Sequence, residues 1–336
     1  MNKYKAAVIG LGNIGLMYDF DQQRPRPSSH VFAYEESDSF ELICGIDGNY
    51  DRENLLRQVA PEALFFDSLS SAFRTNILED VDVISICTPP TTHFELLSEI
   101  ITHRIGKIIF CEKPIVANLD EVKKINEMIH GNKIIVIPNI SRRWNNGLRK
   151  IAGVIESKVY GKLEKINIRY TRGIYNTGAH LFDLLRLWTG ETIEKVMTLN
   201  ETHTSAGPEK SYSFYFESKS GITGYAEAVD DREYYLFDID LYLSSGKIEM
   251  RNSGDDVLYY GLGKHHLFDG YKEFVLDRHE RSLLSDACIK NAVDNIAGVL
   301  SGEEKPNCQI YDAIYPLYIA DALEKSYTTK TMEVIK

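Results

Sequence analysis

The chain has 336 residues, 43% of them hydrophobic and 26% charged, which is typical of a globular protein long enough for two domains. Its formal net charge of −11 argues against nucleic-acid binding, and no apolar run approaches the about 18 residues of a membrane span. The five cysteines form no C-x-x-C pair, so we expect buried thiols in a reducing, cytoplasmic compartment.

The N-terminal segment carries the strongest local signal. A predicted strand, Lys5–Gly10, runs into Gly10-Leu11-Gly12-Asn13-Ile14-Gly15, and an amphipathic stretch follows. In such a turn the first glycine permits the tight bend, the second leaves room for phosphates, and the third lets the following helix pack closely. The segment therefore predicts a dinucleotide site. It does not resemble a secretory signal, because three glycines and Asn13 interrupt the apolar run.

Further apolar runs in the first part of the chain alternate with helical patterns. Strands are predicted at Phe40–Asp47, Val81–Thr88, Lys107–Cys111 and Lys133–Pro138, and a helix is predicted at Leu119–Ile129. This alternation indicates βαβ units and a doubly wound parallel sheet, as in α/β proteins.

The spacing after the glycine motif is unusual. The carboxylate that binds the adenosine ribose usually lies about 20 residues past the third glycine, but the candidate here, Asp47, lies farther along. The surplus is Tyr18–Ser29, whose prolines and charges predict a loop. That loop either overhangs the cofactor site or is a surface insertion without function. Asp47 predicts a preference for NAD over NADP, whereas Arg24, Arg26 and Arg52 could reach a 2′-phosphate.

After Ile140 the pattern changes to strands with alternating apolar and polar residues, which indicates an antiparallel sheet. The predicted strands are Leu163–Thr171, Ser211–Glu217, Thr223–Val229 and Tyr235–Leu243, and the predicted helices are Gly178–Gly190, Leu283–Leu300 and Ile310–Ser326. We therefore expect two domains, 1–138 and 139–336, with the last helices able to pack back on the first domain. The active site is expected in the cleft between them.

Two further clusters carry chemistry. Cys111-Glu112-Lys113-Pro114 ends a predicted strand, at the edge where such sheets place catalytic groups. A lysine there can transfer a proton when burial and the positive nicotinamide ring lower its pKa toward neutrality. The preceding strand ends in Thr88-Pro89-Pro90-Thr91-Thr92-His93, and Asn176-Thr177-Gly178-Ala179-His180-Leu181-Phe182-Asp183 follows later.

With the glycine-rich turn, these motifs resemble the Gfo/Idh/MocA family, the relatives of glucose–fructose oxidoreductase and inositol dehydrogenase, over essentially the whole chain. The resemblance implies an N-terminal Rossmann domain and a C-terminal α/β domain with a large, mainly antiparallel open sheet, often used for oligomerisation. It also implies NAD or NADP as the cofactor, and sugars, cyclitols or nucleotide sugars as substrates.

The resemblance also implies roles for single residues. Lys113 matches the E-K-P lysine that contacts nicotinamide and substrate. His180 matches the histidine of the D-x-G-x-H-x-x-D signature, and Asp183 matches its last, structural aspartate. The first aspartate of that signature is replaced by Asn176, which removes a charged partner for the histidine. We therefore expect Lys113 to be the acid/base, with His180 and Asn176 as hydrogen-bonding groups for the substrate. His180 in a purely structural role is the alternative.

The complete set expected to bind the cofactor combines the glycine turn, the ribose-binding aspartate and the two strand-end motifs. Its members are Gly10, Gly12, Asn13, Ile14, Gly15, Asp47, Thr88, Pro89, His93, Glu112 and Lys113. No metal site is expected, because His265-His266 beside Lys264 is more typical of a solvated loop than of a ligand set.

The sequence thus predicts a cytoplasmic NAD-dependent oxidoreductase that transfers a hydride between nicotinamide and a secondary alcohol of a sugar-type substrate, in surface-glycan metabolism. A homodimer or homotetramer is expected, with neither nucleic acid nor membrane as a partner. Two alternatives stay open: an NAD-dependent glycosidase of the same fold, and a non-catalytic regulator that responds to a dinucleotide.

Overall fold

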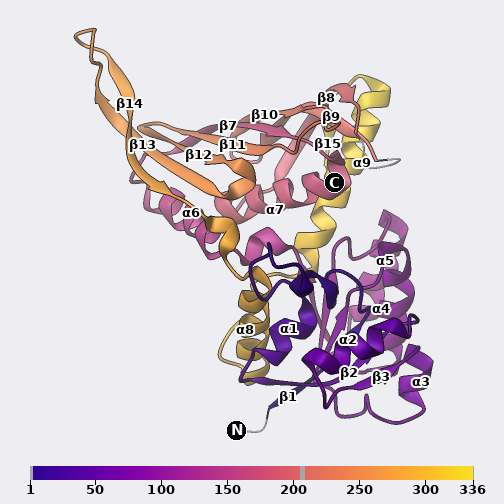
Figure 1. Cartoon of the computed structure of the whole chain (residues 1–336). Coiled ribbons are helices and arrows are strands. Elements are labelled where there is room, and N and C mark those ends of the chain that lie inside the picture. Colours follow the sequence, from indigo (N-terminus) through magenta and orange to yellow (C-terminus); the bar gives the residue numbers. More distant parts are fainter. Residues whose placement is uncertain (1–2, 205–208, 336) are drawn as a thin grey trace. The chain divides into compact units, whose positions relative to one another are not determined.

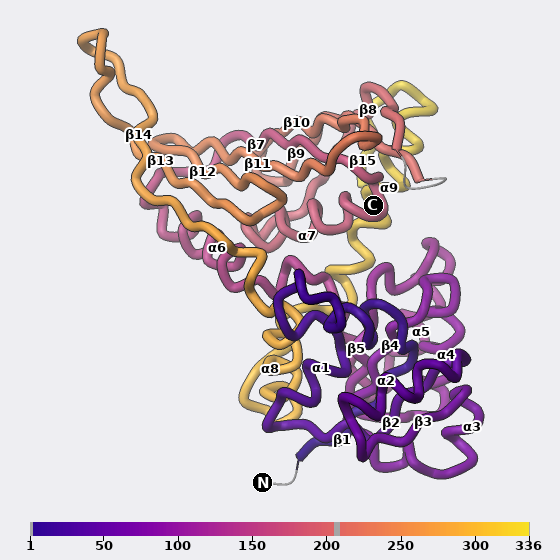
Figure 2. The backbone as a smooth tube through the Cα atoms, viewed as in Figure 1, coloured from indigo at the N-terminus to yellow at the C-terminus, as the bar shows by residue number. Residues whose placement is uncertain are grey.

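The computed structural model of the chain describes residues 3–204 and 209–335. The chain folds into two compact units, which Figures 1 and 2 show together. The first comprises Met1–Trp144 and Ala287–Ile314, and the second comprises Asn145–Asp286 and Tyr315–Lys336. The first unit therefore extends beyond residue 138 and includes a segment from the C-terminal part of the chain.

The first unit is built on a parallel sheet of six strands in the order β3-β2-β1-β4-β5-β6 (Figure 1). Its strands are β1 (Tyr4–Ile9), β2 (Phe40–Ile46), β3 (Leu64–Phe66), β4 (Val83–Ile86), β5 (Ile108–Glu112) and β6 (Ile135–Asn139). All residues of β4 are buried, as expected for a strand covered on both faces. This sheet confirms the predicted doubly wound fold.

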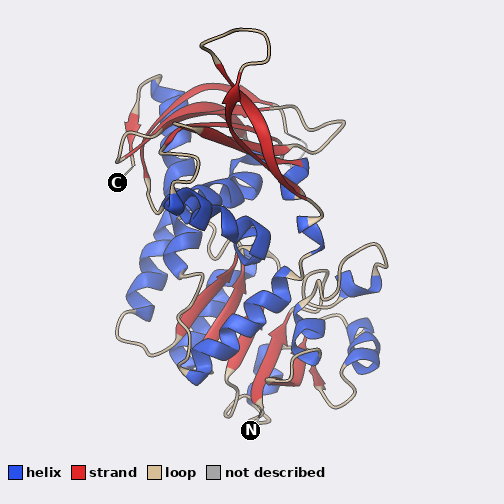
Figure 3. Cartoon of the chain, turned by 90° about the vertical axis from the view of Figure 1, so that its left-hand side faces the viewer, coloured by secondary structure: helices blue, strands red, loops and turns tan. Residues whose placement is uncertain are grey.

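Helices pack against both faces of this sheet (Figure 3). They are α1 (His30–Glu35), α2 (Asp51–Val59), α3 (Leu69–Phe73), α4 (His93–His103), α5 (Leu119–Ile129) and α8 (Cys288–Ser301), of which α8 packs beside α1. A buried ion pair joins the returning segment to the rest of the unit, because Arg143 Nη2 lies 2.9 Å from Asp312 Oδ1.

The amphipathic stretch after the glycine motif is helical for one turn only. One helical turn begins at Gly12, and the chain then leaves the helix in a short 3₁₀ turn, Met17–Phe20, and a series of bends. Helical hydrogen bonding resumes at α1, where the amide of His30 donates to the carbonyl of Ile14 and that of Val31 donates to the carbonyl of Gly15, both at 3.0 Å. The predicted loop, Tyr18–Ser29, is therefore an excursion that interrupts one helix. The helical turn before the excursion and helix α1 after it are hydrogen-bonded to each other.

The second unit contains a sheet of nine strands in the order β14-β13-β12-β11-β7-β10-β9-β8-β15. Neighbouring strands are antiparallel except β7 and β10, which are parallel. The strands are β7 (Leu163–Tyr170), β8 (Ile193–Thr202), β9 (Ser211–Ser218), β10 (Thr223–Ala228), β11 (Phe237–Leu243), β12 (Gly246–Arg251), β13 (Asp256–Lys264), β14 (Lys272–Glu280) and β15 (Glu333–Val334). The predicted open, mainly antiparallel sheet is thus confirmed. It contains nine strands, whereas four strands were predicted from the sequence.

Three helices cover one face of the second sheet (Figure 3): α6 (Asn146–Ser157), α7 (Gly178–Thr189) and α9 (Ile310–Thr329), the last from Tyr315 onward. In the core, Leu181, Leu184 and Trp188 of α7 pack with strand residues such as Phe214. In the sequence, Leu181, Leu184, Leu185 and Trp188 recur at i, i+3, i+4 and i+7, the spacing of one helix face, and this stripe is the buried face of α7.

The hairpin formed by β13 and β14 extends beyond the other strands of the second unit (Figure 2). Val257 and Tyr259 of β13 are buried, but several large apolar side chains of the hairpin are exposed, including Phe268, Phe274, Val275 and Leu276. No helix among the described residues has the length and apolar character required to cross a bilayer.

Candidate functional site

A cavity of about 470 Å³ opens in the first unit at the carboxyl ends of β1, β2 and β4. The strand order reverses between β1 and β4, the point where open α/β sheets bind ligands. The lining residues are Ile9, Gly10, Gly12, Ile46, Asp47, Gly48, Asp67, Ser68, Leu69, Cys87, Thr88, Pro89, Thr92, Glu95, Leu96 and Glu99.

Each glycine of the turn meets a different steric demand. Gly10 has a φ of +91°, and a Cβ there would lie 2.7 Å from the backbone nitrogen of Thr88. A Cβ on Gly15 would lie 1.9 Å from the carbonyl oxygen of Gly10. A Cβ on Gly12, in contrast, would meet no atom within 4 Å. Gly10 and Gly15 are therefore required by the fold itself, and Gly12 leaves open space at the cavity wall, as a bound pyrophosphate requires.

Asp47 supports the turn as well as lining the cavity. Its Oδ2 accepts a hydrogen bond of 2.7 Å from the amide of Leu11, and its Oδ1 accepts one of 2.8 Å from the amide of Asn49. A carboxylate has about four acceptor positions, so capacity for ribose hydroxyls remains.

Three other acidic residues, Asp67, Glu95 and Glu99, line the same cavity. Hydrogen bonds from Ser71 (2.6 Å), Ser68 (2.9 Å) and Tyr50 (3.0 Å) lower the pKa of Asp67 and hold it ionised. The sequence analysis missed Asp67 because β3 has only three residues. Its one available signal was the position of Asp67 directly after the apolar Leu64-Phe65-Phe66 segment.

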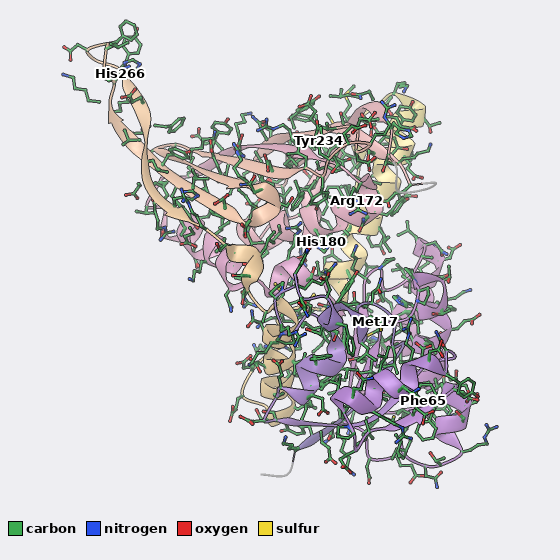
Figure 4. All side chains as sticks on the ribbon, in the orientation of Figure 1. Met17, Phe65, Arg172, His180, Tyr234 and His266 are labelled. Atoms are coloured by element: carbon green, nitrogen blue, oxygen red, sulfur yellow. The ribbon has the colours of Figure 1, made fainter. Side chains whose placement is uncertain are left out.

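The three arginines that could favour a 2′-phosphate are placed elsewhere. The guanidinium of Arg24 lies 3.7 Å from the Tyr18 ring centroid, and that of Arg26 lies 5.8 Å from that of Phe32. Arg52 Nη1 lies 3.2 Å from the sulfur of Met17, which Figure 4 labels. These arginines are absent from the described lining of the cavity.

His93 joins the two strand-end motifs. It is fully buried at the start of α4, with Nδ1 2.7 Å from the carbonyl oxygen of Pro114 and Nε2 2.8 Å from that of Thr88. A carbonyl oxygen only accepts, so the tautomer of the ring decides which of these two nitrogens donates. The Glu112-Lys113-Pro114 turn is thereby tied to a residue that lines the cavity.

The signature residues of the second unit lie at the start of α7. Asn176 belongs to a π-helical turn, Gly173–Thr177, His180 lies in the first turn of α7 (Figure 4), and Asp183 is buried farther along the helix. The backbone amide of Asn176 donates a hydrogen bond of 2.5 Å to Glu209 Oε1. A Cβ on Gly173 would lie 2.2 Å from Glu209 Cδ, so only glycine admits this carboxylate. Glu209, which the sequence analysis did not single out, supplies a carboxylate beside position 176.

The structure thus brings Gly10, Gly12, Asp47, Thr88 and Pro89 together around one cavity, with Asn13, Ile14 and Gly15 in the adjoining turn. Glu112, Lys113 and His93 belong to the same unit, and Asn176 and His180 belong to the other.

His265 and His266 lie at the tip of the β13–β14 hairpin, where Figure 4 labels His266. With Glu273 they form a group whose candidate ligand atoms lie within 4.8 Å of one another. Nδ1 of His265 accepts hydrogen bonds from the amides of Leu267 and Phe268, both at 3.1 Å. A neutral His265 ring therefore carries its proton on Nε2, the nitrogen that faces Glu273, which opposes metal binding there.

The cavity and the turn fit a dinucleotide. An open wall at Gly12, a strand-end carboxylate at Asp47 and a location at the switch point of the sheet are the features that such a cofactor requires. These features define the first unit as a Rossmann-type nucleotide-binding unit.

Comparison with known proteins agrees with this class. Residues 4–140 match the family described as "Oxidoreductase family, NAD-binding Rossmann fold", the Gfo/Idh/MocA family. Myo-inositol 2-dehydrogenase of Thermotoga maritima is 25% identical over 329 residues, which cover 89% of this chain and 91% of that protein. The two findings support assignment of the chain to the Gfo/Idh/MocA family of NAD-binding oxidoreductases, with the family match itself confined to residues 4–140.

Solved structures share the fold of both units. An oxidoreductase from Desulfitobacterium hafniense, described as NADPH-dependent, matches with a TM-score of 0.80 at 18% identity, covering 100% of this chain and 98% of that chain. The WlbA dehydrogenase from Bordetella pertussis, solved with NADH and UDP-GlcNAcA, matches with a TM-score of 0.75 at 17% identity, covering 100% and 99%. At these identities the likeness concerns the fold.

Replacing Gly12 and Gly15 separately by alanine will distinguish binding from folding. Gly15→Ala is expected to lower the free energy of unfolding by about 1–3 kcal/mol, because its Cβ overlaps the Gly10 carbonyl. Gly12→Ala is expected to leave that free energy within about 0.5 kcal/mol of wild type while raising the Kd for NAD at least about tenfold. Urea denaturation and calorimetry measure the two quantities. Wild-type NAD affinity in Gly12→Ala would contradict the assignment.

The acidic lining predicts that NAD binds more tightly than NADP. Asp67→Asn is expected to lower the ratio of the Kd for NADP to the Kd for NAD by up to about tenfold. One charge near a 2′-phosphate is worth on the order of 1 kcal/mol at a surface. Asp80→Asn is the control, because Asp80 pairs with Lys5 and is absent from the described cavity lining. A lower Kd for NADP than for NAD in the wild-type protein would overturn the prediction.

Proposed function

We propose that the protein is an NAD-dependent dehydrogenase that interconverts a secondary alcohol and a ketone on a sugar, cyclitol or nucleotide sugar. The observation that carries this proposal is the link made by His93, which ties the Glu112-Lys113-Pro114 turn to the cavity-lining Thr88. This link holds Lys113 at the edge of the sheet where the nucleotide cavity opens. The proposed reaction needs an acid/base group at that edge.

The proposed chemistry divides between the cofactor and the chain. Oxidation of a secondary alcohol removes a hydride from carbon and a proton from oxygen, and bound NAD would supply the hydride acceptor. Lys113 takes the hydroxyl proton at Nζ, and in the reverse direction it returns that proton to the ketone oxygen. Because the buried His93 contacts the carbonyl of Pro114, the next residue, the amine starts from a restrained backbone.

The start of α7 is proposed to bind the substrate. Asn176 supplies an amide and His180 an imidazole, both suited to hydrogen bonds with vicinal hydroxyl groups. Glu209, hydrogen-bonded to the backbone of Asn176, supports the turn that presents them. His180 and Lys113 belong to different units, so their two proposed roles are tested by separate substitutions.

The substrate class follows from the relatives. One is named myo-inositol 2-dehydrogenase, and another was solved with a nucleotide sugar. We therefore propose a polyhydroxylated cyclic substrate, and a role in surface-glycan metabolism if that substrate is a nucleotide sugar.

A panel of inositols, sugars and UDP-sugars tests this proposal, with turnover measured by the change in nicotinamide absorbance. Release of an aglycone without accumulation of NADH would instead support a glycosidase. Tight NAD binding without turnover would support a regulator.

We also place the enzyme in the cytoplasm. Cys44, Cys87 and Cys111 are buried thiols outside any disulfide, as in a reducing compartment. Burial raises the pKa of the Cys44 thiol to about 12, which makes it unreactive at neutral pH.

Lys113→Ala is expected to lower kcat by about 10²–10⁴-fold without changing the unfolding midpoint, because it removes the acid/base group. Lys107→Ala is the matched control. Lys107 lies just before the other end of β5 and pairs with Asp82 at 2.7 Å. Steady-state kinetics on the substrate found by the panel measures the effect. Near wild-type kcat in Lys113→Ala would refute the role.

The exposed β13–β14 hairpin supports self-association into a homodimer or homotetramer. A cluster of exposed apolar residues on one hairpin is atypical of a monomer surface. Sedimentation velocity is expected to show an oligomer that Phe274→Asp weakens at least about tenfold. Leu64→Asp, a substitution at a side chain of similar exposure in the first unit, is expected to leave the oligomer intact. A wild-type monomer at micromolar concentration would contradict the proposal.

A further inference from the structure

A chain of buried polar groups lies beneath the E-K-P turn in the first unit. His30 is fully buried, with Nδ1 3.0 Å from Ser85 Oγ and Nε2 3.1 Å from Glu112 Oε1. Tyr34 extends this chain on one side, since its hydroxyl lies 2.9 Å from Ser85 Oγ. Asn139 extends it on the other side, because its Nδ2 donates to Glu112 Oε1 at 2.6 Å.

The direction of these hydrogen bonds follows from the groups at the two ends. The Glu112 carboxylate only accepts, so His30 Nε2 carries a proton and donates to it. Burial raises the pKa of Tyr34, which therefore stays protonated. In the His30 tautomer with its proton on Nε2 alone, Nδ1 accepts from the Ser85 hydroxyl, and Ser85 in turn accepts from Tyr34. All donors then point toward Glu112, and every bond is satisfied.

The excursion, Tyr18–Ser29, ends directly before His30. Asp19, fully buried, accepts hydrogen bonds from the amide of Ser28 (2.8 Å) and from the hydroxyl of Ser29 (2.5 Å). The backbone amide of His30 then bonds to Ile14 within the glycine turn. Two sets of bonds thus fix the position from which the His30 side chain reaches Glu112.

Lys113 is the residue between two anchored neighbours. Glu112, on its N-terminal side, is held by His30 and Asn139, with its side chain only 14% exposed. The carbonyl of Pro114, on its C-terminal side, is held by His93. The backbone on each side of Lys113 is therefore restrained by a buried imidazole.

We propose that His30 is a positioning residue for Lys113, acting through Glu112. The proposal rests on the acid/base role of Lys113 given above. The end of the excursion then has a defined role, because it positions His30. The Nε2 proton of His30 fixes the Glu112 carboxylate and thereby the E-K-P turn. Without that donor, Asn139 alone holds this carboxylate among the bonds described, and the lysine amine samples more orientations.

The chain offers a matched pair of substitutions at one position. His30→Gln places an amide NH₂ within reach of Glu112, whereas the shorter side chain of His30→Asn reaches Ser85 but not Glu112. Both keep a polar group in the buried site, so both are expected to fold. Tyr34→Phe removes the far end of the hydrogen-bond chain and serves as the control for a purely structural contribution.

The first measurement is steady-state kinetics. His30→Asn is expected to lower kcat by about 10–100-fold, the scale of a misplaced reacting group, with the Kd for NAD changed less than about threefold. His30→Gln is expected to recover at least half of the logarithmic loss, and Tyr34→Phe to stay within about threefold of wild type. Equal kcat values for His30→Asn and His30→Gln would overturn the proposal.

The second measurement needs neither substrate nor turnover. In the protein without cofactor, lysines are reductively methylated with ¹³C, and the Lys113 signal is assigned by Lys113→Arg. Its chemical shift is expected to move in His30→Asn and to return in His30→Gln, with no change in Tyr34→Phe. An unmoved signal in His30→Asn would refute the positioning role. A moved signal together with an active Lys113→Ala would refute the acid/base role alone.

Discussion

The close approach of Gly10 to the end of β4 is the constraint on which the nucleotide site depends. With no Cβ at Gly10, the turn after β1 lies against the backbone of Cys87 and Thr88. This contact brings the ends of two neighbouring strands to one edge, and the cavity opens there. Gly15 extends the constraint by letting the first helical turn lie against the Gly10 carbonyl. The amide of Leu11 is then in place for Asp47, so the strand end, the turn and the Asp47 carboxylate form one hydrogen-bonded unit.

Buried histidines organise the edge of the sheet that carries Lys113 in the same way. The ring of His93 lies between two loop carbonyls and that of His30 contacts a carboxylate, and neither ring reaches solvent. A buried polar group left without its partner costs about 1–3 kcal/mol, so each ring strongly favours the one loop geometry that satisfies it. The loop after β5 also buries the apolar side chains of Ile115 and Val116. The arrangement around Lys113 therefore depends on these hydrogen bonds together with packing.

The sequence predicted elements whose signal is local and missed those whose partners are remote. Apolar runs located five of the six parallel strands, and the stripe of α7 predicted its buried face. The three-residue β3 is too short for any periodicity, so Asp67 went unrecognised. The β13–β14 hairpin escaped because its exposed apolar residues do not alternate. His30 gave no signal at all, since its partners Ser85 and Glu112 lie far along the chain. Likewise, the carboxylate at Glu209 could not be paired with Asn176 from spacing.

The excursion shows why a spacing rule can fail while the geometry behind it holds. A helix tolerates an inserted loop when hydrogen bonds connect the residues before and after it, as His30 to Ile14 and Val31 to Gly15 do here. The entropic cost of closing such a loop grows only slowly with its length. Asp47 therefore lies late in the sequence yet at the usual place in space, bonded to the glycine turn. The same bonds make the loop's last residues part of the fold, so the insertion ends in a fixed side chain rather than in a free segment. That is why the histidine directly after the insertion, and not the insertion's exposed arginines, reaches the E-K-P turn.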